Sequence, residues 1–194
     1  VLTSRGLGDV YKRQAAAAQR HLTYYELDLG LNHVVRRWSE PTDNAANMLI
    51  AVPGGGDGPG GVLVCCENYI LYRHEEHPEV RAALPRRPDL PAERGVLLVA
   101  SATHRQKSMF FFLVQSEYGD LYKVTLEHSD DRVSDVVVRY FDTLPAPCAS
   151  VCVLKTGFLF AAAEFGDHAL YQFEGLGDDA EEEAARKEWL QYYL

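Results

Sequence analysis

Two histidines form the most conspicuous group of possible metal ligands in this chain. His74-Glu-Glu-His77 places two imidazoles three positions apart, with carboxylates between them. Metal-binding histidine pairs usually lie four positions apart on a helix, as in His-Glu-x-x-His, whereas here Pro78 follows the second histidine at once. We therefore favour a solvated loop over a metal site at this position.

Four cysteines lie within apolar runs, as the adjacent pair Cys65-Cys66 and as Cys148 and Cys152. Neither pair has further ligands at the spacing of a zinc site. Adjacent side chains of a strand point to opposite faces of its sheet, so Cys65 and Cys66 must meet different surroundings. We predict buried free thiols, which suit a reducing compartment.

No group of residues has the pattern of a catalytic or cofactor site. The loop Gly54–Gly61 lacks the Gly-Lys-Ser/Thr ending of a phosphate-binding loop, and a hairpin rather than a helix should follow it. Ser101, Ser108 and His104 have no aspartate at a position that would complete a triad. The sequence thus predicts a non-enzymatic protein with no catalytic residue, cofactor, metal or small-molecule substrate.

Basic side chains gather between residues 81 and 107. Such a patch could bind RNA phosphates or an acidic protein surface. Glutamates at positions 75, 76, 79 and 93 stand among these basic residues and favour a solvated loop edge of balanced charge. The residues that we single out as candidate RNA or partner contacts are Arg86, Arg87, Arg105 and Lys107.

Composition narrows the class of protein further. The 194 residues are 47% hydrophobic, which is enough for a core, and no apolar run approaches the roughly 18 residues of a membrane span. The formal net charge is −9, and the stretch Glu174–Glu188 supplies seven acidic residues against two basic ones. An acidic chain argues against binding to nucleic acid through charge alone. Val1–Gln14 has no apolar core of a secretory signal.

The elements that must position these residues are β-hairpins, and Ser101–Leu126 is the clearest of them. An apolar run, Met109–Val114, precedes a Gly-Asp turn and a second apolar run, Leu121–Leu126. Phe110 and Phe112 point to one face of the strand, while the residues between and after them point to the other. Both faces must then be apolar, as expected when sheets are stacked face to face like propeller blades.

The same hairpin occurs three times. In each copy an apolar strand leads to a glutamate and a turn, and the second strand carries Leu-Tyr. The turn glutamates Glu67, Glu117 and Glu164 lie 50 and 47 positions apart, a period typical of four-stranded propeller blades. We therefore predict an all-β fold, an incomplete β-propeller of about three four-stranded antiparallel blades. The predicted strands are 48–52, 62–66, 69–72 and 80–84 in the first blade, 96–102, 109–115, 121–126 and 133–141 in the second, and 149–154, 158–163 and 169–173 in the third.

The ends of the chain do not follow the repeat. Residues 1–20 are predicted to be a foreign or disordered leader, and residues 179–194 an acidic tail that forms a short helix or frays. Residues 21–178 form the partial propeller, with Leu22–Leu31 as the outer strand of a further blade and 39–43 as a turn. Since propellers close with four to eight blades, we expect the arc to be open, marginally stable by itself, and completed by more chain or by self-association.

Several long motifs lie between roughly Leu22 and Asp179. They are YELDLGLNHVVR, VPGGGDGPGGVLVC, ENYI, SATHRQKSMFFFLVQSEYGD, YFDTLP, CVLKTGFLFAAAEFGDH and LGDD. Together these motifs closely resemble the first β-propeller of the splicing factor 3b subunit 3 family. This family is related to the large subunit of the damaged-DNA-binding complex and to the largest subunit of the cleavage and polyadenylation factor.

The resemblance implies a nuclear, non-enzymatic scaffold of the U2 small nuclear ribonucleoprotein. In that family three propellers hold the helical-repeat subunit 1 and the small subunit 5 during branch-site recognition in pre-mRNA splicing. Two other functions remain open on the same fold. One is an RNA-binding propeller module that uses the basic patch, and the other is a ubiquitin-ligase or DNA-repair adaptor like the damaged-DNA-binding relative.

Overall fold

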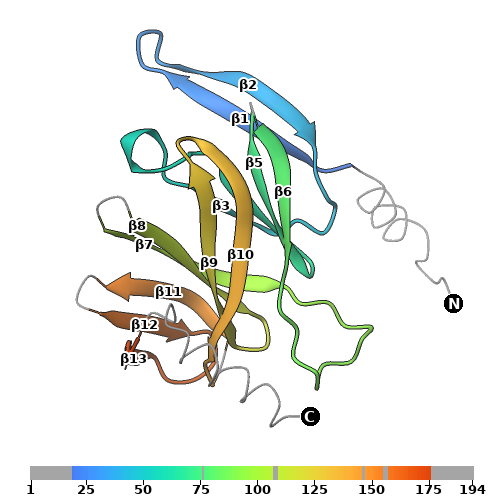
Figure 1. Cartoon of the computed structure of the whole chain (residues 1–194), viewed down its shortest axis with the longest axis vertical. Coiled ribbons are helices and arrows are strands. Elements are labelled where there is room, and N and C mark those ends of the chain that lie inside the picture. Colours follow the sequence, from blue (N-terminus) through green and yellow to red (C-terminus); the bar gives the residue numbers. More distant parts are fainter. Residues whose placement is uncertain (1–18, 76, 107–108, 146, 155–156, 176–194) are drawn as a thin grey trace, which may run out of the picture. The chain divides into compact units, whose positions relative to one another are not determined.

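A computed structural model describes residues 19–75, 77–106, 109–145, 147–154 and 157–175 of the chain. The chain divides into two compact units, residues 1–46 and residues 47–194. In Figure 1 the first unit contains the blue hairpin and the second contains the green to red strands. The expected leader up to residue 18 and the expected acidic helical tail lie outside the described residues.

The first unit is a two-stranded antiparallel hairpin of β1 (His21–Asp28) and β2 (His33–Pro41). The turn between them contains Asn32 at φ 53, and the Asp28 carboxylate accepts hydrogen bonds from two backbone N–H groups of the turn. We expected one strand here and a chain leading away through a turn at 39–43, and that expectation was wrong. Val34, Val35 and Trp38 have the β-branched or aromatic side chains of a strand, but the charged pair Arg36-Arg37 between them obscures the pattern.

The described residues of the second unit form three antiparallel sheets, which we call blades 1, 2 and 3. Within each blade the strands pair in the order in which they occur in the sequence. Blade 1 is β3 (Met48–Ala51), β4 (Val62–Cys66), β5 (Tyr69–His74) and β6 (His77–Ala83), and a short 3-10 turn, η1 (Gly55–Asp57), lies between β3 and β4. Blade 2 is β7 (Leu98–Gln106), β8 (Met109–Ser116), β9 (Asp120–Ser129) and β10 (Arg132–Thr143), and blade 3 is β11 (Cys148–Leu154), β12 (Phe158–Ala163) and β13 (Ala169–Gln172).

All eleven strands predicted for these blades are present, and the main differences are at their ends. Strand β7 continues to Gln106, four residues past its predicted end, because His104 and Arg105 pair with Phe111 and Phe110 of β8. Polar side chains next to the turn of a hairpin do not interrupt the ladder, since the ladder is held by backbone hydrogen bonds. Side-chain polarity therefore marked the strand end too early.

Two apolar clusters join the blades, and strand β8 contributes to both. Phe112 and Val114 pack with Leu63, Tyr72 and other buried residues of blade 1. From the opposite face of the same strand, Phe111 and Leu113 pack with residues of blade 3 such as Leu159. This arrangement confirms that β8 is covered on both faces. The second unit is a partial β-propeller.

The repeat is also visible in the backbone hydrogen bonds of the turns. The N–H groups of Glu117 and Glu164 each donate to the carbonyl of the residue just before the first strand of their own blade, at 2.9 and 3.3 Å. After the fourth strand, the N–H groups of Leu84 and Leu144 each donate at 2.9 Å to a turn residue with positive φ, Asn68 or Gly119. A side chain at Gly119 would meet the Leu144 carbonyl at 2.5 Å, so this close approach requires glycine.

Blade 3 has one buried face and one exposed face. Val151 and Leu159 belong to the cluster shared with blade 2, whereas the alternate residues Cys152, Phe160 and Leu170 are exposed. Cys65, Cys66 and Cys148 are buried free thiols as predicted, but the prediction was wrong for Cys152. It lies on the face against which the described residues place no sheet.

This difference between the cysteines predicts a simple labelling pattern. Burial raises the pKa of the Cys65 thiol to about 12. Since the thiolate is the reactive form, Cys65 is protected from a thiol reagent both by its buried position and by its raised pKa. In the native protein we expect a disulfide-exchange reagent to modify Cys152 first and the other three cysteines only after unfolding. Mass spectrometry of peptides after a short labelling pulse measures the order, and early labelling of Cys65 would contradict the buried position.

Among the described residues no helix is long and apolar enough to cross a membrane.

Candidate interaction site

One turn fixes both ends of the linker between blades 1 and 2. The backbone N–H of Asn68 donates to the Val96 carbonyl, its side-chain oxygen accepts the Val96 N–H, and its own carbonyl accepts the Leu84 N–H, all at 2.9 Å. Asn68 has φ 71, a conformation that asparagine tolerates better than most residues. Residues 84 and 96 are thereby held at the same turn, and the basic linker between them is a closed loop.

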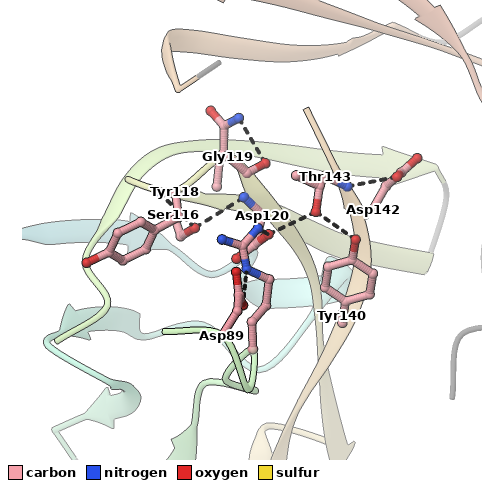
Figure 2. Close-up of polar contacts among 10 residues, drawn as sticks. Asp89, Ser116, Tyr118, Gly119, Asp120, Tyr140, Asp142 and Thr143 are labelled. Atoms are coloured by element: carbon pink, nitrogen blue, oxygen red, sulfur yellow. Dashed lines mark hydrogen bonds and ion pairs between the residues drawn. The ribbon is translucent and has the colours of Figure 1, made fainter. Parts of the chain in front are cut away.

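Asp120, at the start of β9, is the centre of a buried polar network (Figure 2). Its Oδ1 accepts a hydrogen bond from Thr143 Oγ1 at 2.8 Å and lies 3.2 Å from the Arg87 guanidinium. Arg87 comes from the linker and also pairs with Asp89 at 3.2 Å. Tyr140 extends the network, since its hydroxyl lies 2.7 Å from Thr143 Oγ1. The network therefore ties the linker to both β9 and β10.

Burial dominates the electrostatics of this network. It raises the pKa of the Asp120 carboxyl, while the Thr143 hydrogen bond and the Arg87 charge act in the opposite direction. Burial likewise raises the pKa of Tyr140 to about 12, so its hydroxyl keeps its proton and can donate to Thr143. Because a buried carboxylate is costly unless it is paired, Arg87 serves as the internal counter-ion of Asp120.

The other residues singled out as RNA or partner contacts also have contacts within the chain. Arg86 donates to the Asn68 side-chain oxygen at 3.4 Å and to the Pro91 carbonyl. Arg105 forms an ion pair with Asp57 of the glycine-rich loop. Lys107 lies outside the described residues. The structure thus gives Arg86, Arg87 and Arg105 oxygen partners within the chain.

Blades 2 and 3 are joined by a buried glutamine that sequence reasoning missed. Gln115 of β8 accepts a hydrogen bond from the Cys148 N–H at 2.7 Å and donates to the Gly119 carbonyl at 3.3 Å. The sequence hints at this residue only by placing a polar side chain at the end of an apolar strand. Its hydrogen-bond partner is 33 positions away, so the sequence alone does not show that the buried amide is paired.

Replacing Gln115 by leucine tests this connection. The side chain keeps its size and gains apolar character, but the Cys148 N–H loses this acceptor in a buried place. We expect the free energy of unfolding to fall by about 1–3 kcal/mol. Urea unfolding followed by circular dichroism measures the change, and an unchanged midpoint would show that the hydrogen bond contributes little.

A surface cavity of about 510 Å³ lies between the glycine-rich loop and the β9–β10 turn. Its lining is acidic, with Arg105 paired to one of the aspartates. Within the described residues no group of three or more histidine, cysteine or acidic side chains could hold a metal ion. The lining residues are Gly55, Gly56, Asp57, Gly58, His128, Asp130 and Asp131.

Comparison with known proteins agrees with this architecture. Residues 10–191 match the family model described as the RSE1/DDB1/CPSF1 first beta-propeller. The chain belongs to this family. The match includes the second half of the expected leader and most of the expected acidic tail, as well as the three blades.

Members of this RSE1/DDB1/CPSF1 propeller family with similar sequences occur in distant organisms. Spliceosome-associated protein 130 A of Arabidopsis thaliana is 63% identical over 171 residues, which cover 88% of this chain and 14% of that protein. The probable splicing factor 3B subunit 3 of Dictyostelium discoideum is 58% identical over 86% of this chain and 13% of its own length. Splicing factor 3B subunit 3 of Drosophila melanogaster is 57% identical over 87% of this chain and 14% of its own length. The chain thus spans about one seventh of the length of these relatives.

Proposed function

We propose that this chain is a propeller segment of a non-enzymatic splicing scaffold. The proposal rests on one observation, the 57–63% identity over most of the chain to proteins named as splicing factor 3B subunit 3 or spliceosome-associated protein. A splicing factor acts in the nucleus, so we propose a nuclear location. The role is rigid display: stacked blades fix the positions of their loops, and the loops or blade faces dock protein partners.

The proposed partners are the other subunits of the splicing factor 3b complex, in particular the helical-repeat subunit 1 and the small subunit 5. Their binding would support branch-site recognition within the U2 small nuclear ribonucleoprotein. The hydrogen bonds of Asn68, the Asp120 network and Gln115 support this role, because each of them ties two segments of the propeller together. Loops that are held in this way lose little conformational entropy when a partner binds.

Reconstitution with purified subunits tests the proposal. Full-length protein carrying this segment should bind purified subunits 1 and 5. The same protein with Phe112→Ala, which removes a side chain from between blades 1 and 2, should bind them less. Arg139→Ala, a substitution at an exposed position of β10, serves as the control. Absence of binding by the unaltered protein would contradict the proposal, and binding of a ubiquitin-ligase component instead would indicate the adaptor role.

Direct RNA contact through Arg86, Arg87, Arg105 and Lys107 remains a separate prediction. It requires RNA affinity that falls steeply with salt and with reversal of these charges. Filter binding of a single-stranded RNA at two salt concentrations, with Arg86→Glu and Arg105→Glu variants, measures both dependences. Affinity that does not respond to salt, or no affinity at all, would remove this function.

A further inference from the structure

The hairpin of β5 and β6 brings the rings of His74 and His77 into contact. His74 is the last residue of β5 and His77 is the first residue of β6, and the two are direct partners in the antiparallel ladder. Their ring centroids lie 4.6 Å apart with an interplanar angle of 39°. The sequence favoured a solvated loop here, because the helical spacing of a metal-binding pair is absent. In a hairpin, residues three positions apart can instead meet across the turn.

One nitrogen of this pair lacks a partner. The Nε2 atom of His77 is buried and has no hydrogen-bond partner in the part of the chain that the structure describes. Buried polar atoms of native proteins are nearly always paired, and an unpaired one calls for an explanation such as an ion or a water. Other atoms of both side chains are partly exposed, so the pair lies near the surface although this nitrogen itself is covered.

The separation of the rings fits a shared metal ion. A zinc ion binds an imidazole nitrogen at about 2.0–2.1 Å, so two imidazoles on one ion at right-angled to tetrahedral geometry have centroids about 4.5–5 Å apart. The observed separation of 4.6 Å lies in this range. Neutral imidazole is a preferred ligand of Zn²⁺, Ni²⁺ and Cu²⁺. We propose that His74 and His77 form a binding site for one divalent transition-metal ion, with water completing its coordination.

The site differs from a structural zinc site. The described residues contain no group of three or more metal-binding side chains, so two imidazoles and water supply the ligands. The ion should therefore exchange readily and follow the usual order of divalent affinities, with Cu²⁺ bound more tightly than Zn²⁺. Mg²⁺ and Ca²⁺ prefer oxygen ligands and should not compete. Bound metal would link β6 to β5 at the turn end of the hairpin.

Titration of the untagged full-length protein with Zn²⁺ tests the site. Isothermal titration calorimetry should show binding that is reversed by a chelator and unaffected by excess Mg²⁺. His74→Gln and His77→Gln should each weaken it by at least roughly tenfold, since loss of a mere supporting residue of a metal site already costs 10- to 100-fold. The matched control is His128→Gln, which changes a histidine at the acidic cavity and should leave this affinity unchanged.

Three results would overturn the proposal. The first is no Zn²⁺ binding by the unaltered protein, and the second is binding that survives both His74→Gln and His77→Gln. The third is loss of binding in His128→Gln alone, which would show that the ion binds in the cavity beside Asp130. If a glutamine variant does not fold, NMR of the unaltered protein decides. Zn²⁺ must shift the ring signals of His74 and His77 and spare those of His128 and His168.

Discussion

Replacing Arg87 by alanine is expected to lower the free energy of unfolding by about 3–5 kcal/mol at neutral pH. The substitution leaves the Asp120 carboxylate, which is fully buried, without its counter-ion. Burial already raises the pKa of Asp120, and loss of the guanidinium raises it further. A carboxyl group whose pKa is higher in the folded than in the unfolded state stabilises the fold at low pH and loses that contribution as the pH rises. The deficit of the variant should therefore shrink on acidification.

Urea unfolding at about pH 7 and about pH 5 measures both effects. The double variant Arg87→Ala/Asp120→Asn should recover most of the lost stability at neutral pH, because the asparagine oxygen still accepts from Thr143 and carries no charge. Arg86→Ala, at the neighbouring half-buried position, is the control. Its side chain donates to uncharged oxygens, so its loss should cost about 1 kcal/mol or less. If Arg87→Ala costs no more than this control, the pair behaves like a surface salt bridge and does not hold the linker.

The blades were predictable because their signals are local. Each hairpin carries apolar runs on both sides of a turn, and the repeated glutamates at positions 67, 117 and 164 set the period. The first hairpin was harder, since β2 contains Arg36-Arg37 and its register shifts at a bulge between Tyr24 and Tyr25. A bulge moves side chains to the other face, so simple alternation no longer marks the strand.

The polar contacts were not predictable, because their partners are distant in the sequence. Arg87 and Asp120 are 33 positions apart, and the residues around each of them give no indication that the two form a pair. Arg87 was interpreted as a surface cation, and Asp120 only as part of a turn. The exposure of Cys152 was missed for a related reason. Alternation tells which residues share a face, but not whether another sheet covers that face.

The second large effect is expected at strand β8. Phe112→Ala should destabilise the protein by about 3–5 kcal/mol, because the fully buried ring packs in the cluster that joins blades 1 and 2. Phe111→Ala should cost a comparable amount, although this ring points to the opposite face and packs in the cluster shared with blade 3. A strand with one solvent face would give one large and one small effect. Thermal or urea unfolding of both variants measures the pair of values.

Phe160→Ala provides the matched control for these two substitutions. Its ring belongs to blade 3, is 40% exposed, and lies on the face opposite the cluster shared with blade 2. Less apolar area is withdrawn from water there, so truncation should cost distinctly less than at β8. If Phe160→Ala is as damaging as Phe112→Ala, that face of blade 3 is covered in the protein that is measured. If Phe111→Ala is instead as mild as this control, blades 2 and 3 do not pack as described.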